Sequence, residues 1–211
     1  MMHVHIKICG FTEPVGMTAA IDAGVDSIGL VLDPSPRQLS LEQAIQLAEY
    51  VPDHVELIAV CGRPSVAEVA EISERLKPKF IQLMADSMPD PKHGFSILPA
   101  FEDGPDLLAR VNAYCAQHAE DRPLVLADGP RPGSGITADW SRVEQLSDSM
   151  RLMLAGGLTP ENVGAAIVRM RPFGVDVSSG VERTRGIKDP DRVRDFVAAV
   201  RSAEAQLGET P

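Results

Sequence analysis

The sequence is short of aromatic residues and of cysteine, and both shortages narrow the class of protein. Aromatic side chains make up 4% of the 211 residues, and the three cysteines, Cys9, Cys61 and Cys115, form an odd set without paired spacing. Disulfide-rich and zinc-stabilised domains need cysteines in regular pairs. The five histidines show no ligand spacing either. We therefore expect a reduced, cytoplasmic protein with no metal site.

Basic residues and long apolar runs are also scarce. Acidic residues outnumber basic ones by 30 to 20, so the formal net charge is −10, which argues against a nucleic-acid partner. No run approaches the length of a membrane span, and the first ten residues lack the pattern of a secretory signal. A content of 44% hydrophobic and 24% charged residues is typical of a globular domain. We expect one domain over residues 1–205 and a polar tail over 206–211.

Short apolar segments alternate with helix-like segments along the whole chain. The predicted strands are residues 4–9, 26–32, 55–60, 80–84, 95–101, 124–127, 152–155 and 174–178. They are apolar throughout rather than alternating, as in a parallel sheet that is buried on both faces. Strand–helix alternation implies right-handed crossovers between parallel strands. The pattern predicts a single α/β domain, a (β/α)8 barrel with eight parallel strands, and a doubly wound open sheet is the alternative.

Side chains that cap helices follow several of these strands. The candidate N-caps are Thr12, Ser40, Ser65 and Asp189. Two further helices are expected at residues 105–119 and 160–170, the second with Pro160 in its first turn. The helix after the fourth strand is poorly marked, because Pro89 and Pro91 interrupt it.

Two strand ends near the C-terminus consist of small residues. M-L-A-G-G occupies residues 153–157, and V-D-V-S-S-G occupies residues 175–180. Glycine lets the backbone approach a ligand closely, and a helix N-terminus favours an anion. In barrels the last two strand–helix units often bind phosphate. We expect a small phosphorylated ligand to be held by Gly156, Gly157, Ser179 and Gly180.

Cys9 and Asp128 each end a predicted strand, where a barrel places its active site. Cys9 can be a buried apolar residue or a thiolate favoured by the following helix N-terminus. Asp128 can start a turn with Gly129, or serve as a general acid if burial raises its pKa. Such a pair would suit proton transfers on a sugar.

Two cations accompany these residues. Lys7 shares the strand face of Cys9 and would lie inside the barrel, where Asp176 on the neighbouring eighth strand is an available partner. The pair can be structural or can tune Cys9. Arg37, in D-P-S-P-R, can bind a carboxylate through its planar guanidinium or can be a solvated loop residue.

The motifs occur in order over nearly the whole chain. They are K-I-C-G-F-T at residues 7–12, S-P-R at 35–37, I-Q-L at 81–83, Asp128, G-S-G at 133–135, L-A-G-G-L-T-P-E-N-V at 154–163, G-V-D-V-S-S-G-V-E at 174–182 and G-I-K-D at 186–189. Together they resemble the phosphoribosylanthranilate isomerase family.

The resemblance implies a (β/α)8 barrel that acts in tryptophan biosynthesis without a cofactor. The implied reaction is the Amadori rearrangement of N-(5-phosphoribosyl)anthranilate to 1-(2-carboxyphenylamino)-1-deoxyribulose 5-phosphate. By matched position, Cys9 resembles the general base, Asp128 the general acid, and Arg37 the residue that faces the anthranilate carboxylate. Further substrate contacts are implied for Lys7, Gln82, Gly135 and Asp176. Monomers and homodimers are both compatible with the sequence.

The sequence departs from the family pattern at the predicted anthranilate side of the barrel mouth. Met84 stands where the family usually has histidine, Cys61 replaces a phenylalanine, and the loop over residues 129–135 is short. Two alternatives follow: a related isomerase for another phosphorylated aminosugar, and a non-catalytic barrel that binds a phosphorylated ligand.

Overall fold

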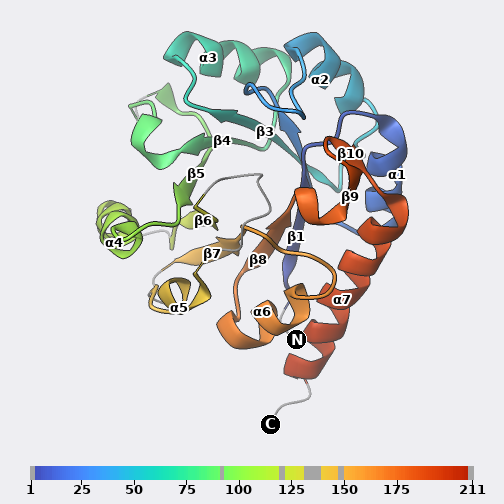
Figure 1. Cartoon of the computed structure of the whole chain (residues 1–211). Helices are drawn as coiled ribbons and strands as arrows, with labels where there is room; N and C mark the ends of the chain where they lie inside the picture. The colour runs from blue at the N-terminus through green and yellow to red at the C-terminus, as the bar shows by residue number, and fades with distance from the viewer. Residues whose placement is uncertain (1–2, 91–92, 119–121, 131–138, 147–149, 209–211) are drawn as a thin grey trace.

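Eight parallel strands close into a barrel (Figure 1). The computed structural model describes residues 3–90, 93–118, 122–130, 139–146 and 150–208. The strands are β1 His5–Cys9, β2 Ser27–Val31, β3 Glu56–Gly62, β4 Phe80–Met84, β5 Ile97–Glu102, β6 Leu124–Asp128, β7 Arg151–Leu154 and β8 Gly174–Val177. Because β8 pairs in parallel with β1, the barrel prediction is confirmed and the open-sheet alternative is wrong.

Helices surround this barrel (Figure 1). They are α1 Pro14–Ala23, α2 Leu41–Ala48, α3 Val66–Arg75, α4 Leu107–Gln117, α5 Trp140–Val143, α6 Val163–Met170 and α7 Pro190–Gly208. Ser40 and Ser65 form the predicted N-caps, each in a capping box. Between β4 and β5 lies a 3-10 turn, η1 Ala85–Ser87, at the point where the sequence marks a helix poorly.

Two predicted helix starts are wrong. The hydroxyl of Thr12 does not cap α1; it donates instead to the carbonyl of Gly186, 2.8 Å away. Helix α6 begins at Val163 rather than at residue 160. Asn162 causes this later start, because its amide group bonds the backbone of Thr159 at 2.8 Å and of Gly157 at 2.9 Å and so stabilises a preceding turn.

The segment after β8 is more elaborate than the sequence indicates. It contains a 3-10 turn, η4 Ser179–Val181, and a short antiparallel pair, β9 Glu182–Thr184 and β10 Ile187–Lys188. Asp189 then caps α7, as predicted, by accepting from the backbone of Asp191 at 2.9 Å. Helix α7 continues through Gly208, past the predicted start of the polar tail, and the division into domain and tail stays a prediction.

The apolar core has two parts. A large cluster lies between the strands and the helices, and a smaller one fills the barrel interior. The interior cluster consists of Ile58, Leu98, Ala100, Leu126, Met153 and Ala155. Side chains two residues apart on a strand share a face, so the interior position after Leu126 on β6 is Asp128. The interior therefore changes from apolar to polar at the carboxyl ends of the strands.

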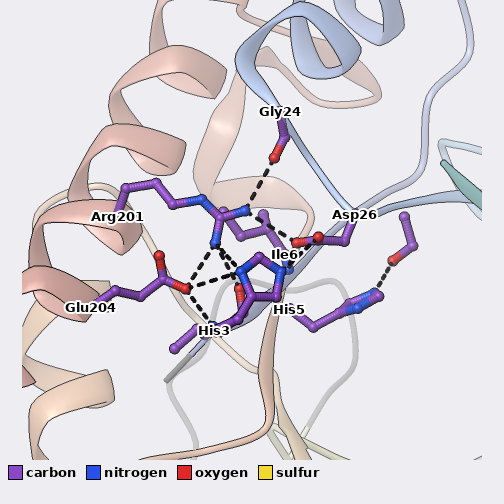
Figure 2. A network of polar contacts seen from close by, with 9 residues as sticks. His3, His5, Ile6, Gly24, Asp26, Arg201 and Glu204 are labelled. Carbon is purple, nitrogen blue, oxygen red and sulfur yellow. Dashed lines mark hydrogen bonds and ion pairs between the residues drawn. The ribbon is translucent and has the colours of Figure 1, made fainter. Parts of the chain in front are cut away.

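A polar network fastens α7 to the opposite, amino-terminal end of the barrel (Figure 2). The Asp26 carboxylate lies 2.8 Å from the His3 ring, accepts from the Ile6 amide at 2.7 Å and pairs with Arg201 at 3.2 Å. Arg201 also donates to Glu204 at 2.9 Å, and Glu204 accepts from the Val4 amide. The network joins the starts of β1 and β2 to the last helix.

Candidate active site

A cavity of about 380 Å³ opens at the carboxyl ends of the strands. Its walls include Cys9, Arg37, Gln82, Asp128, Asp176 and Ser178. These side chains come from β1, β4, β6, β8, the loop after β2 and the position after β8, so residues far apart in the sequence converge on one space. The structure thus brings together the predicted proton-transfer pair and three of the predicted substrate contacts.

Cys9 is the last residue of β1 and is 7% exposed. Gly29, its partner on β2, leaves room for the thiol, since a Cβ there would lie 2.9 Å from Cys9 Sγ. Burial raises the pKa of the Cys9 thiol, and the neighbouring Lys7 opposes that rise. Desolvation thus outweighs the favourable charges at Cys9, and the role of its thiolate stays a prediction.

Asp128 is the last residue of β6 and faces the same cavity. Burial raises the pKa of its carboxyl group to about 7, and the charge of Asp176 adds to this effect. The Gly129 amide donates to Asp128 Oδ1 at 2.7 Å and opposes the rise, and the alternative that Asp128 starts a turn stays a prediction. A carboxyl group with this pKa is partly protonated at neutral pH and can act as a general acid.

Lys7 and Asp176 form the predicted ion pair inside the barrel. Lys7 Nζ lies 2.9 Å from Asp176 Oδ1, and the two residues are in register across β1 and β8. Asp176 lines the cavity, whereas fully buried Lys7 does not contribute to the wall that the described residues form. A direct substrate contact by Lys7 stays a prediction.

Arg37 is buried, at 4% exposure, so the alternative of a solvated loop residue is wrong. Its guanidinium donates to both carboxylate oxygens of Glu182, at 2.6 and 3.0 Å. Gly10, at φ +83°, makes this placement possible, because a Cβ there would lie 2.3 Å from Arg37 Cδ. The same Glu182 carboxylate accepts from Lys188 at 3.0 Å.

Glu182 and Lys188 were missed by the sequence reasoning about the site. The only available signal was their position in the V-E and G-I-K-D motifs, because nothing in β9 and β10 indicates burial of charge. Lys188 is 2% exposed, and its ammonium group also donates to the Ser178 carbonyl at 3.0 Å. The two residues connect the β9–β10 pair to the wall of the cavity.

The two glycine-containing motifs pack directly on each other. A Cβ on Gly180 would lie 1.9 Å from the carbonyl oxygen of Leu158. A Cβ on Gly156, whose φ is +86°, would lie 2.3 Å from the amide nitrogen of Gly129, beside Asp128. Only glycine permits these contacts, so the M-L-A-G-G and V-S-S-G segments form one surface that adjoins the candidate acid.

A second, more open cavity of about 630 Å³ lies over this surface. Gly157, Ser179 and Gly180 line it, whereas Gly156 packs against the backbone of Gly129 and is not part of its wall among the described residues. Two arginines that the sequence analysis did not single out, Arg183 and Arg192, also line this cavity. The carboxylate residues Glu182 and Asp189 line it as well. Glycine backbone, a hydroxyl and guanidinium groups in one open cavity are the groups that suit a phosphate group.

Gln82 and Met84 complete the wall on β4. Both line the first cavity, and Gln82 Oε1 has no hydrogen-bond partner within the described part of the chain. Cys61 instead packs in the outer core, where burial raises its pKa to about 12. Of the departures from the family pattern, Met84 therefore faces the cavity and Cys61 does not. Gly135 and most of the short loop lie outside the described residues.

Comparison with known families agrees with this geometry. A family model described as N-(5'phosphoribosyl)anthranilate (PRA) isomerase matches residues 6–199. A relative from Roseiflexus castenholzii, named N-(5'-phosphoribosyl)anthranilate isomerase, is 38% identical over 94% of this chain and 98% of its own length.

Solved structures extend the comparison to three dimensions. Phosphoribosyl anthranilate isomerase from Thermotoga maritima is 30% identical and superposes with a TM-score of 0.82, over 95% of this chain and all of the other. A second solved isomerase of this name, in complex with reduced 1-(o-carboxyphenylamino)-1-deoxyribulose 5-phosphate, is 28% identical, with a TM-score of 0.80 over 95% of this chain and 100% of that chain. No helix among the described residues is long and apolar enough to cross a membrane. The chain belongs to the N-(5'-phosphoribosyl)anthranilate isomerase family.

Proposed function

We propose that this protein isomerises N-(5'-phosphoribosyl)anthranilate to 1-(2-carboxyphenylamino)-1-deoxyribulose 5-phosphate. The observation that carries the proposal is the convergence of Cys9 and Asp128 on one cavity that adjoins the glycine-lined surface. Both chemical steps of this Amadori rearrangement are proton transfers, so a thiol and a carboxyl group suffice without a cofactor.

In the first step, the neutral carboxyl group of Asp128 protonates the ring oxygen of the sugar. The bond between C1′ and that oxygen breaks, and the anthranilate nitrogen supplies the electron pair that forms a C1′=N Schiff base. In the second step, the thiolate of Cys9 removes the proton from C2′, and the electrons form a C1′=C2′ enolamine. Tautomerisation of the enolamine then gives the ketone of the product.

The remaining residues would fix the two charged ends of the substrate. The phosphate would bind at Gly156, Gly157, Ser179 and Gly180, of which the last three line the second cavity. Arg37 receives the anthranilate carboxylate while Glu182 orients its guanidinium. Gln82 Oε1 and Asp176 accept hydrogen bonds from sugar hydroxyl groups. The contact proposed for Gly135, the cytoplasmic location and the choice between monomer and homodimer stay predictions.

Loss of substrate fluorescence, followed with freshly prepared phosphoribosylanthranilate, tests the proposal. We expect turnover by the intact protein and a loss of roughly 10²–10⁴-fold or more in Cys9→Ala. The matched control is Cys115→Ala, which removes another buried thiol on α4, outside the cavity wall, and should retain activity. No turnover by the intact protein, or full activity of Cys9→Ala, would contradict the proposal.

Growth of a tryptophan auxotroph that lacks the isomerase provides the second test. Complementation by the intact gene distinguishes this substrate from another phosphorylated aminosugar, and complementation that depends on Cys9 excludes a non-catalytic binding protein. Failure to complement despite normal expression would favour one of those alternatives.

A further inference from the structure

A buried ion pair lies at the floor of the first cavity. Lys7 Nζ and Asp176 Oδ1 are 2.9 Å apart, and the two side chains are 0% and 9% exposed. Burying two charges has a desolvation cost that their attraction often only offsets, so such a pair is weak evidence for a role in stability. Its position between two reactive groups points to a role in the reaction.

The register of the strands sets the orientation of the pair. Cys9 follows Lys7 by two residues on β1, so both face the barrel interior. On the other side, the pairing of Ala127 with Leu154 and of Leu154 with Val175, continued by one residue, aligns Asp128, Ala155 and Asp176. In this register Ala155 is the residue between Asp128 and Asp176, and Glu102 of β5 is in register with Asp128 on its other side. The ammonium group therefore lies on the side of the base and the carboxylate on the side of the acid.

The electrostatic effects of the two charges follow this orientation. Burial raises the pKa of Cys9, and Lys7 lowers it more strongly than Asp176 raises it. Burial also raises the pKa of Asp128, and here Asp176 contributes more than the opposing Lys7. Lys188 also lowers the pKa of Cys9, and Glu102 also raises the pKa of Asp128. The Lys7–Asp176 pair adds to both effects, favouring the thiolate at one end and the neutral carboxyl group at the other.

The reaction needs both of those forms at once. Because the thiol has the higher pKa of the two groups, the productive combination of thiolate and neutral acid is a minor protonation state of the coupled pair. Its population falls about tenfold for each pH unit by which the two pKa values move apart. An interaction that brings the pKa values of Cys9 and Asp128 closer together therefore raises the rate of the reaction.

We propose that Lys7 and Asp176 act as positioning residues whose oriented charges keep Cys9 available as the thiolate and Asp128 as the neutral acid. This inference rests on the proposed roles of Cys9 and Asp128. It assigns one ion pair to both ends of the proton transfer, whereas a purely structural pair would affect neither group selectively.

The test is the double variant Lys7→Met/Asp176→Asn, which removes both charges and leaves neither unpaired. We measure kcat/KM from pH 5 to 10, and the alkylation rate of Cys9 by iodoacetamide, resolved by peptide mass spectrometry. The pH profile should broaden as the two apparent pKa values separate, and the maximum of kcat/KM should fall about tenfold per unit of separation. Unchanged pKa values would overturn the proposal, whatever the change in rate.

A single variant supplies the test if the double variant does not fold. Asp176→Asn keeps the ammonium group, so the alkylation profile of Cys9 should shift to lower pH, and an unshifted profile would overturn the proposal. The matched control is Asp26→Asn at the other end of the barrel, which should leave both profiles unchanged. A shifted alkylation profile in a protein without turnover would support the ion pair while contradicting the proposed substrate.

Discussion

The two ends of the barrel carry polar networks of similar composition but opposite electrostatic character. At the amino-terminal end, His3, Asp26, Arg201 and Glu204 satisfy one another (Figure 2). Burial alone would raise the pKa of Asp26, but hydrogen bonds from the Ile6 amide and His3 lower it. At the carboxyl-terminal end, burial dominates and raises the pKa values of Cys9 and Asp128.

The difference shows how one fold separates stability from chemistry. At the amino-terminal end, hydrogen bonds and ion pairs stabilise the charged form of Asp26, so the folded protein favours its carboxylate. At the other end, Cys9 and Asp128 are desolvated without full compensation, which destabilises their charged forms and prepares them to exchange protons. Variants at the two ends should therefore change different quantities.

The largest effect on activity is expected for Asp128→Asn, which should reduce turnover roughly 10²–10⁴-fold. The same variant should be more stable than the wild type above pH 7, by roughly 2–4 kcal/mol. The folded pKa of about 7 exceeds the ordinary value of 3.8, so the folded state keeps a proton that the unfolded state releases. Wild-type stability should thus fall as pH rises from 3.8 to 7, and this fall should be absent in Asp128→Asn.

Urea unfolding at pH 4, 5.5 and 8 measures this linkage, with turnover assayed in parallel. Equal stability of the two proteins at all three pH values would show that burial does not destabilise the Asp128 carboxylate. That result would contradict the proposed difference between the two ends of the barrel.

A glycine at each end offers a matched comparison of steric effects. Gly29→Ala places a Cβ 2.9 Å from Cys9 Sγ and should displace the thiol, which we expect to lower kcat by up to about 10²-fold. Gly24, at φ +86° and with open space around it, lies at the other end. Gly24→Ala should cost about 1 kcal/mol of stability and leave kcat unchanged. Thermal unfolding and steady-state kinetics of both variants decide whether this assignment holds.

Asp26→Asn should affect stability and spare activity. Its carboxylate accepts from Ile6, His3 and Arg201, and losing charge-assisted hydrogen bonds of this kind costs roughly 2 kcal/mol at pH 7. Because the folded pKa lies below the ordinary 3.8, this stabilisation is present above that value and is lost as pH falls through the folded pKa. Unfolding at pH 7 and pH 3 should show a large difference between variant and wild type at pH 7 and a smaller one at pH 3. A reduced kcat in this variant would contradict the separation of roles.

The smallest effect is expected for Arg37→Lys. An ammonium group cannot donate to both oxygens of Glu182 and also bind a substrate carboxylate in the same plane, so KM should rise about tenfold with little change in kcat. Arg75→Lys, in an exposed ion pair on α3, serves as the control and should change neither constant. A lower kcat at constant KM would place Arg37 in the chemical step instead.

Much of the fold could be predicted because each buried strand is an apolar run that ends in a turn residue. The Lys7–Asp176 pair followed from the same pattern, since closure of the barrel makes their strands neighbours. The β9–β10 pair was missed because strands of three and two residues carry no periodic signal. The predicted helix cap at Thr12 is wrong because its hydroxyl bonds Gly186, 174 residues away, and local sequence does not indicate such a distant partner.

The candidate site shows the same limit. Strand ends located Cys9 and Asp128, but local sequence could not predict whether burial or nearby charge would dominate at Cys9. Partners such as Glu182 for Arg37 depend on long-range packing. The substrate contacts carried over from the resemblance await the experiments above.

The pairing of β1 with β8, which closes the barrel, has a consequence for how the protein folds. It joins residues 169 positions apart, through the Lys7–Asp176 pair and through the Ser178 hydroxyl that donates to the Cys9 carbonyl at 2.9 Å. Closing so long a loop has a large entropic cost, so contacts of this kind form slowly. Since Cys9 and Lys7 come from the first strand and Asp176 from the last, we expect enzymatic turnover to recover only when the barrel closes. The recovery of activity during refolding should therefore report when β1 pairs with β8.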